Sequence, residues 1–453
     1  MEKLRERLRY LQDPHLVARF QHFCGVRGTF SRSGAGKAAD QTPPLNNGAL
    51  HHHSAGESDG DNSAVTGAGE GEKPTGVRRR IADLNLKEGS ESPPQNGAAG
   101  GAPELREENG SEAPVKVKPL RKNSLTGDAG QEFLIQNRFL YYMFTLGTEL
   151  GNESFYITFF PFIMWNVDVF ISRRLVMVWV WVMYLGQCTK DVVGWSRPAS
   201  PPVVKVEMFY NCEYSMPSTH AMSGTAIPFS LFLLTYGRWE YPSSLGFCLA
   251  LSWCLLVCSS RIYLGMHSVL DVIAGVLYSV LILIFFLPAL DLIDDFNLNC
   301  RFAPLVIISL HLGLGLFSFT LDTWSTSRGD TAQILGTGAG VTLASHVNQR
   351  LGLLPDPTPD RLPLSFPSLG AGLVAAAVMR LVVGVLVLVA TRALMKAVTI
   401  PLVCRVFGIP SDDVRKARQH MEVELPYRYI VYGTVGFNVL FLVPLLFSHL
   451  QLS

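Results

Sequence analysis

The sequence predicts an all-α membrane protein, a bundle of helices that crosses the bilayer many times and follows a polar N-terminal tail. Two observations support this fold class. Hydrophobic residues make up 48% of the 453 residues and charged residues only 17%, with a mean hydropathy of +0.24. Polar residues gather in the first third of the chain, and the remainder contains apolar runs long enough to span a membrane. The 38 Lys and Arg residues nearly balance the 37 Asp and Glu residues without forming a basic stripe, so no nucleic-acid partner is expected.

Residues 1–137 are expected to form a mostly disordered polar tail. The N-terminus lacks the apolar segment of a cleaved signal peptide, so the first membrane span would direct insertion. Apolar residues recur at helical spacing from Leu4 to Leu11, which leaves two alternatives for residues 1–25: a short amphipathic helix on the membrane surface, or an unstructured end. Residues 28–130 are rich in Gly, Ser, Pro, Asn and charged residues, a composition that cannot offset chain entropy.

Residues 138–453 are expected to form the membrane domain. Its apolar runs lie at residues 138–168, 174–194, 219–237, 243–260, 267–290, 303–321, 331–348, 366–408 and 428–449. Each run except 366–408 has the length of one span, and that run is long enough for two helices, so nine or ten spans are expected. Gly151 to Glu153 could divide the first run into two short helices, which would change the side of the membrane on which the tail lies.

Basic residues near the ends of the spans predict an orientation for the bundle. The cluster at 415–418 would be cytosolic under the positive-inside rule, as would the pair at 173–174. Both assignments hold together if the 366–408 run is a pair of helices. The loop 190–217 and the turn 261–267 would then lie on the opposite face, away from the cytosol.

Two polar clusters place cations close to a membrane boundary, where charged groups are costly and therefore indicate function. Lys190 and Arg197 are seven residues apart, close to two helical turns, so both cations could point the same way. Arg261 lies at the end of a later run. His267 and Asp271 open the next run four residues apart and would share one helix face.

A third cluster opens the run at 219–237 with Pro217, Ser218, Thr219 and His220. The free N–H groups at a helix start form a ready anion site. Together the three clusters bring three cations, two histidines, an orienting carboxylate and a helix N-terminus to one boundary, which predicts a site for a tetrahedral oxyanion. These residue types supply the charge stabilisation, the nucleophile and the proton donor that phosphoryl transfer needs.

No metal ion or other cofactor is expected. Asp271 is tied to a histidine by its spacing, and Asp291, Asp294 and Asp295 lie at the far end of the following span, so the carboxylates form no Mg²⁺ cage. The eight cysteines have no spacing typical of a disulfide scaffold or a zinc site. Those inside apolar runs are interpreted as buried thiols: Cys188, Cys248, Cys254 and Cys258.

The order and internal spacing of these blocks resemble the three-part signature of the type 2 phosphatidic acid phosphatase superfamily. The blocks are Lys190 with Arg197-Pro198, then Pro217 to His220, then Ser260-Arg261 with His267 and Asp271. Thr219 departs from the commoner pattern, which has Gly at this position. The difference concerns how the loop fits around the site. Further stretches over the membrane part are similar to the sphingosine-1-phosphate phosphatase family, at residues 184–189, 200–205, 319–330 and 415–427.

The resemblance implies a fold and an activity. The fold would be a phosphatase core of about six helices with extra C-terminal spans, in the endoplasmic reticulum membrane with its site facing the lumen. The activity would be metal-independent hydrolysis of sphingosine-1-phosphate and related sphingoid base 1-phosphates. His267 would attack phosphorus to form a phosphohistidine, Asp271 would hold its imidazole in the reactive tautomer, and His220 would protonate the leaving oxygen. The phosphate would be bound by Lys190, Arg197, Ser218, Thr219 and Arg261.

Other functions stay open on the residues alone. A transporter or receptor for a lipid phosphate could use the same cations, although simple binding does not require the paired His220 and His267. A vanadate-dependent oxidase could use the same pocket, because vanadate mimics phosphate. Among phosphatases, the alternative substrates are a sugar phosphate or a polyprenyl diphosphate. Membrane lipid surrounds such a bundle, and the sequence assigns no protein partner.

Overall fold

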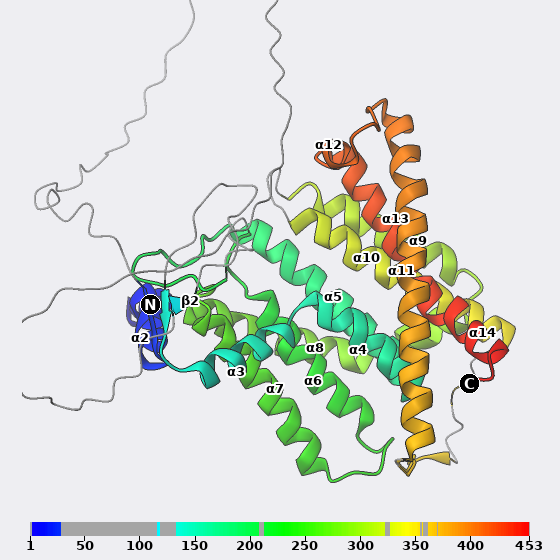
Figure 1. Ribbon diagram of the computed structural model, residues 1–453, viewed down its shortest axis with the longest axis horizontal. Helices are drawn as coiled ribbons and strands as arrows, with labels where there is room; N and C mark the ends of the chain where they lie inside the picture. The colour runs from blue at the N-terminus through cyan, green and yellow to red at the C-terminus, as the bar shows by residue number, and fades with distance from the viewer. Residues whose placement is uncertain are drawn as a thin grey trace, which may run out of the picture. The chain divides into compact units, whose positions relative to one another are not determined.

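The computed structural model describes residues 2–28, 116–117, 133–207, 213–321, 327–353, 356, 361–368 and 370–452. Most of the tail that was predicted to be disordered lies outside the described residues. The described part is built almost entirely from α-helices (Figure 1). The all-α fold class is therefore confirmed.

The helices occur in a simple order along the chain. They are α1 (Glu2–Gln12), α2 (Pro14–Phe23), α3 (Arg138–Glu149), α4 (Glu153–Asn166), α5 (Val169–Val193), α6 (Thr219–Thr235), α7 (Ser243–Tyr263), α8 (Val269–Asn299), α9 (Ala303–Ser318), α10 (Ser327–Leu351), α11 (Ala371–Phe407), α12 (Val414–Ala417), α13 (Met421–Leu440) and α14 (Leu442–His449). Three short strands, β1 (Val26–Gly28), β2 (Lys116–Val117) and β3 (Phe133–Ile135), form an antiparallel sheet in the order β1–β3–β2. This sheet was not predicted, because strands of two or three residues carry too little periodicity to read.

Several of the described helices are long and apolar enough to cross a membrane. They are α5, α7, α8, α11 and the continuous segment Met421–His449. The run 138–168 is divided into α3 and α4 on either side of Gly151, which is the break that the sequence offered. For the run 366–408 the sequence left one or two helices open, and the structure has one continuous helix, α11.

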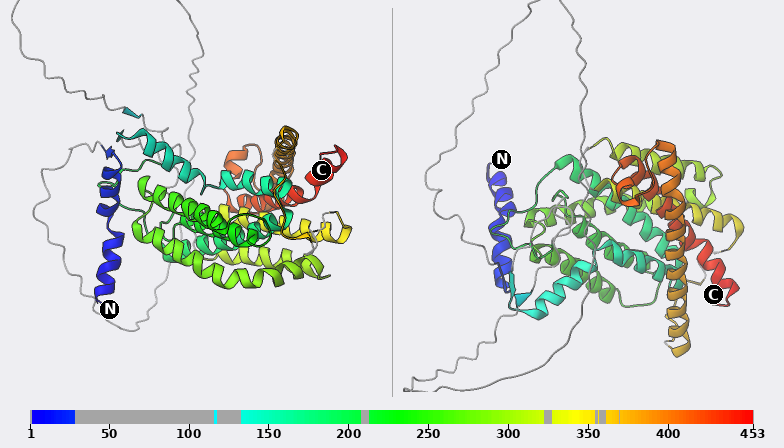
Figure 2. Two further views of the ribbon diagram at one scale, coloured as in Figure 1. Left: turned by 90° about the horizontal axis from the view of Figure 1, so that it is seen from below. Right: turned by 45° about the horizontal axis from the view of Figure 1, so that its top comes forward.

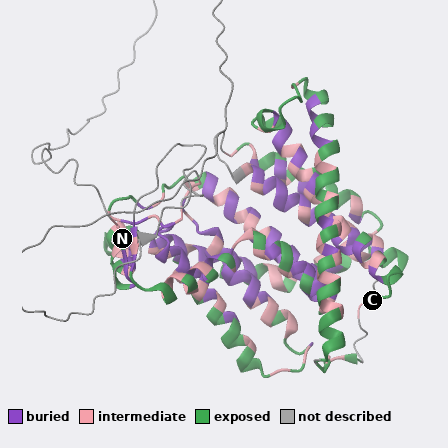
Figure 3. Cartoon of the chain, viewed as in Figure 1, coloured by how far each residue is buried: buried purple, intermediate pink, exposed green. Residues whose placement is uncertain are grey.

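Helix α5 lies in the middle of the bundle, in contact with α4, α6, α8 and α10 (Figure 1). In its most apolar stretch 72% of the residues are buried by protein, against 11% for α11, most of whose length is exposed (Figure 3). Leu175 and Trp179 of α5 belong to the largest apolar core cluster. Since α11 buries so little surface inside the protein, its apolar side chains are suited to contact lipid.

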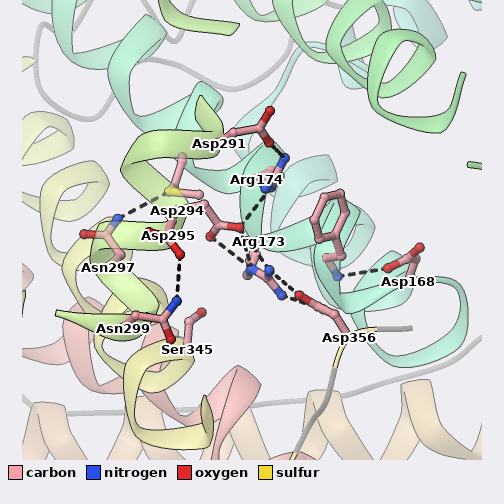
Figure 4. Close-up of polar contacts among 12 residues, drawn as sticks. Asp168, Arg173, Arg174, Asp291, Asp294, Asp295, Asn297, Asn299, Ser345 and Asp356 are labelled. Atoms are coloured by element: carbon pink, nitrogen blue, oxygen red, sulfur yellow. Dashed lines mark hydrogen bonds and ion pairs between the residues drawn. The ribbon is translucent and has the colours of Figure 1, made fainter. Parts of the chain in front are cut away.

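At the N-terminal end of α5, two arginines are buried in a network of ion pairs (Figure 4). Nη2 of Arg173 is 2.9 Å from Asp294 and 2.6 Å from Asp356. Arg174 contacts Asp294 at 2.9 Å and Asp291 at 2.5 Å. These arginines join α5 to α8 through ion pairs.

The other basic cluster lies at the opposite end of the bundle. Arg428, in the helix that follows the 415–418 cluster, pairs with Asp330 in the first turn of α10 at 2.8 Å. The far end of α10 lies beside the Arg173 network, where His346 bonds to a carbonyl oxygen of α8. Because α11 is a single helix, the two basic clusters end up at opposite ends of α10. The expectation that both lie on one face of the membrane is therefore wrong.

The N-terminal helices pack across the ends of the bundle helices (Figure 2). Gln21 of α2 is 1% exposed, and its Nε2 donates to the carbonyl oxygens of Val204 and Tyr263 at 2.6 and 2.9 Å. Its Oε1 accepts a hydrogen bond from the Val204 N–H at 3.0 Å. Gly265 has a φ of +72° here, and a Cβ at this position would come within 2.4 Å of the Val204 carbonyl oxygen. Buried hydrogen bonds thus join α2 to the two loops that lead into the candidate site.

Candidate active site

The C-terminal end of α5 carries the first predicted cation. Lys190 is 2% exposed, and its carbonyl accepts the N–H of Gly194, which ends the helix with a left-handed φ of +63°. Arg197 therefore lies in the loop after the helix, and the prediction that both cations point the same way along one helix is wrong. The two cations meet all the same, because both contact Glu213.

Glu213 lies between two cations of the site. Its Oε2 is 3.1 Å from Nζ of Lys190 and 3.7 Å from Nη2 of Arg197. Burial alone would raise the pKa of the Glu213 carboxyl, but the attraction of Lys190 and Arg197 outweighs this and holds the pKa below its ordinary value. Sequence reasoning missed Glu213, because a single glutamate in a loop has no spacing signal. Its carboxylate lies between the two cations, at a position where a phosphate oxygen would meet the same charges.

Arg261, the third cation, is fully buried at the end of α7. Its Nη1 is 3.2 Å from Oε2 of Glu207 and 3.5 Å from Oγ1 of Thr148. Its Nε and Nη2 are buried without a hydrogen-bond partner among the described residues. Unpaired donors of a buried guanidinium cost free energy, so these two groups point to an anionic ligand.

Helix α6 begins at the second predicted block. Ser218 is its N-cap, and its Oγ accepts the N–H of Ala221 at 3.4 Å, which leaves its O–H able to donate. Thr219 is the first helical residue, and its backbone N–H belongs to the groups that have no acceptor within the helix. Nε2 of His220 is 2.8 Å from Oδ1 of Asn152, at the junction of α3 and α4. This block therefore brings a histidine and free N–H groups to the same end of the bundle.

His267 lies in the turn between α7 and α8 and is 1% exposed. Ser268 is the N-cap of α8 and forms a capping box with Asp271. His267 thus precedes the helix, and the prediction that His267 and Asp271 share one helix face is wrong. Nδ1 of His267 is 3.9 Å from Oδ2 of Asp271, which is too far for a hydrogen bond.

Ser215 links these two residues. Its Oγ donates to Oδ2 of Asp271 at 2.6 Å and lies 3.3 Å from Nδ1 of His267. On the other side of the ring, Nε2 is 3.5 Å from Nη1 of Arg197. A ring protonated at Nδ1 satisfies this arrangement, because Nδ1–H donates to Ser215 while the lone pair of Nε2 faces the cations. Sequence reasoning missed Ser215, for which nearness to the Pro217 block was the available signal.

The electrostatics of the site favour a neutral imidazole. Burial, together with the positive charges of Arg197 and Arg261, lowers the pKa of His267 well below its ordinary value. Burial also lowers the pKa of Arg197 to about 10, which leaves the guanidinium charged at neutral pH. The site therefore combines a neutral ring, whose lone pair can attack an electrophile, with cations that can bind an anion.

A cavity of about 650 Å³ lies between the N-terminal helices and the loop around Arg197. Its lining includes Tyr10 and Asp13 on one side and Asp271 on the other. It provides an opening that does not pass between the long apolar helices.

The residue types that bind metals are dispersed. Among the described residues, no group of three or more His, Cys, Asp or Glu side chains is placed to hold a metal ion. Cys254 and Cys258 are buried thiols as expected, whereas Cys188 is only half-buried and Cys248 is exposed. The prediction of burial is wrong for Cys248, because its face of α7 is not covered by another helix.

The chain is similar to known proteins over nearly its whole length. Residues 158–292 match the model of the PAP2 superfamily. Sphingosine-1-phosphate phosphatase 1 of Rattus norvegicus is 53% identical over 98% of this chain and 97% of its own length. Sphingosine-1-phosphate phosphatase 2 of Homo sapiens is 35% identical over 99% of both chains. No solved structure matches the chain.

The similarity covers the site and the helices beyond it. All predicted site residues, from Lys190 to Asp271, lie within the region matched by the superfamily model. The similarity to the relatives extends further, through α9 to α14. The chain therefore belongs to the sphingosine-1-phosphate phosphatase family.

Proposed function

We propose that this lipid phosphate phosphatase hydrolyses sphingosine-1-phosphate and related sphingoid base 1-phosphates, through a phosphohistidine on His267 and without a metal ion. The names of its relatives support this substrate class. The observation that carries the proposal is the fully buried Arg261, whose Nε and Nη2 have no partner among the described residues. A tetrahedral phosphate can accept both donors and lie beside the other two cations and His267.

In the first step, Nε2 of His267 attacks phosphorus, and the bond from phosphorus to the sphingoid oxygen breaks. Ser215 accepts from Nδ1–H and donates to Asp271, so the ring keeps the tautomer that presents Nε2. Lys190, Arg197 and Arg261 balance the charge on the equatorial oxygens. The N–H of Thr219 and the hydroxyl of Ser218 add hydrogen-bond donors.

His220 is proposed to give the leaving oxygen its proton. The amide oxygen of Asn152 accepts from Nε2–H of His220, and Nδ1 is the ring nitrogen proposed to exchange protons with the substrate. In the second step, neutral His220 takes a proton from water, whose oxygen attacks phosphorus and releases His267 and inorganic phosphate. The proton lost in the first step is recovered in the second, so the site returns to its starting state.

We further propose that the protein lies in the endoplasmic reticulum membrane with its site facing the lumen. The family resemblance supports both points. The charge pattern adds no support, because the two basic clusters lie at opposite ends of α10 and the 415–418 cluster lies at the same end of the bundle as the site. Glycosylation sequons inserted beside residue 411 and, in a second variant, beside residue 239 test the orientation. A glycan on the first alone supports a lumenal site, and a glycan on the second alone contradicts it.

The central experiment measures phosphate release by the detergent-purified full chain in EDTA. Sphingosine-1-phosphate is compared with phosphatidic acid and glucose-6-phosphate. We expect selective, chelator-resistant release that falls at least about 10³-fold in His267→Ala and stays normal in His449→Ala, which alters an exposed histidine far along the chain. An acid-labile phosphoenzyme should form in His449→Ala and not in His267→Ala.

Each alternative has its own signature in the same assay. Release that survives in His267→Ala contradicts the nucleophile, and release that stops in EDTA contradicts metal independence. A preference for glucose-6-phosphate contradicts the substrate class. A folded wild type that binds sphingosine-1-phosphate and releases no phosphate is a binding or transport protein.

A further inference from the structure

A second cavity, of about 180 Å³, lies among α4, α5, α10, α11 and α13. One end is polar and is lined by Glu153, Gln333, Arg392 and Tyr432. The rest is apolar and reaches Met164. Three of the five helices lie beyond the region that matches the superfamily model, so this cavity depends on the C-terminal extension of the chain.

Along α4 and α10, the cavity lining changes from polar residues at one end to apolar residues at the other. On α4 the lining extends from Glu153 to Met164, a distance of about 16 Å at the helical rise of about 1.5 Å per residue. On α10 it extends from Gln333 through Thr337 to Val341. About 16 Å is half of the roughly 30 Å hydrocarbon core of a bilayer, the depth of one leaflet. The cavity therefore has the length and polarity of a single hydrocarbon chain with a polar head.

The polar end of this cavity adjoins the phosphate site. Glu153 begins α4 and directly follows Asn152, whose Oδ1 is 2.8 Å from Nε2 of His220. Glu153 also interacts electrostatically with Glu213, the carboxylate that lies between Lys190 and Arg197. Glu153 and His220 therefore belong to neighbouring parts of the same end of the bundle.

Neither Glu153 nor Arg392, the two charged residues that line this end, forms an ion pair among the described residues. Oε1 of Glu153 accepts a hydrogen bond from Nε2 of Gln333. Nearby, Asp330 pairs with Arg428 at 2.8 Å, and Arg392 lies over an aromatic ring of α13 at 5.6 Å. The Glu153 carboxylate can accept a charge-assisted hydrogen bond from a ligand that carries a cation close to its phosphate.

We infer that Glu153, oriented by Gln333, binds the ammonium group of a sphingoid base phosphate, and that the cavity behind it receives the sphingoid chain. This inference rests on the proposed function. The ammonium of such a substrate lies on the carbon next to the one that carries the phosphate. The negative phosphate would therefore bind the cations, and the positive ammonium would bind the adjacent Glu153. A plain alkyl phosphate has no cation at that place, which makes Glu153 a specificity-determining residue.

The test compares sphingosine-1-phosphate with octadecyl phosphate, which has the same chain length and no ammonium. In Glu153→Gln, the ratio of the two kcat/KM values should fall by about 10- to 100-fold, the loss expected for one charge-assisted hydrogen bond. In Gln333→Leu, the ratio should fall in the same direction by a smaller factor. The matched control is Glu149→Gln, which removes an exposed carboxylate four residues earlier and should leave the ratio unchanged.

The outcomes separate this inference from the proposed function. An unchanged ratio in Glu153→Gln, or an equal loss on both substrates, overturns the ammonium site while hydrolysis by the wild type still stands. If Glu153→Gln does not fold, the ratio in Gln333→Leu decides in the same way. If the folded wild type releases phosphate from neither substrate, the proposed function fails and this inference falls with it.

Discussion

The buried arginines near the two ends of α5 differ in how fully they are paired: Arg173 and Arg174 belong to α5 itself, and Arg261 belongs to α7. At one end, three aspartates surround Arg173 and Arg174 with ion pairs of 2.5 to 2.9 Å. At the other end, Arg261 is at least as deeply buried, and two of its donor nitrogens are unpaired among the described residues. Buried charge is costly unless it is paired, so the first set fits a structural role and the second a ligand site. The arginine of the site thus differs from the structural arginines in its unpaired donor nitrogens and not in its burial.

The largest expected effect is the loss of activity when Arg261 of the site is replaced. Arg261→Met should lower kcat/KM by about 10³-fold or more, the loss seen when a guanidinium that stabilises a phosphoryl transition state is removed. Its folding should be less affected than that of Arg173→Met, because methionine removes two unpaired donors together with the charge, and the Glu207 carboxylate that loses its partner is 19% exposed. Phosphate release and thermal unfolding in detergent measure both quantities. A strongly destabilised Arg261→Met would show that this arginine is structural after all.

The second prediction concerns the paired end. Arg173→Met should destabilise the protein by about 3–5 kcal/mol, because it leaves Asp294 buried without its full set of partners. The folded fraction should keep the wild-type kcat, since this network lies at the far end of α5. The double variant Arg173→Met/Asp294→Leu should recover part of the stability. A fall in kcat without a fall in stability would contradict the structural role of Arg173.

The third prediction sharpens the chemistry of the unpaired end. Ser215→Ala should lower kcat by about 10- to 100-fold with little change in KM, because His267 loses the hydrogen bond that fixes its tautomer. Ser215→Thr keeps the hydroxyl and should restore most of the rate. Equal activity of Ser215→Ala and the wild type would show that Asp271 acts on His267 without an intermediary.

The smallest effect is a dependence of stability on pH. The folded pKa of His267 lies below its ordinary value of about 6.5, so protons bind preferentially to the unfolded chain. The stability due to the neutral ring is therefore fully present above about pH 6.5 and is lost as the pH falls, by at most about 1.4 kcal/mol per pH unit. Unfolding of His267→Asn should depend less on pH across this range. Identical pH dependence in both proteins would contradict the buried neutral ring.

The sequence predicted the residues of the site better than their local geometry. Lys190, Arg261 and His267 come together as expected, because charged residues at the ends of apolar helices meet at one boundary. The end of α5 at Gly194 was missed, since residue spacing does not say where a helix stops.

The connecting residues were missed for a related reason. Glu213 and Ser215 act through contacts across the fold, and such contacts leave no periodic trace in the chain. The fold class was predictable because long apolar runs have few alternatives to a helix, whereas the division of 138–168 and the continuity of α11 depend on packing and lipid.

The hydrogen bonds of Gln21 make the first 28 residues part of the phosphatase. A protein shortened to begin at residue 133 would keep every proposed catalytic side chain and lose the contacts that fix the Val204 and Tyr263 carbonyls. Cleavage within residues 32–112 would turn α2 from a tethered part into a separable peptide, and tethered groups have effective concentrations in the millimolar range. Activity after such a cut should then depend on protein concentration and recover when a peptide of residues 1–28 is added.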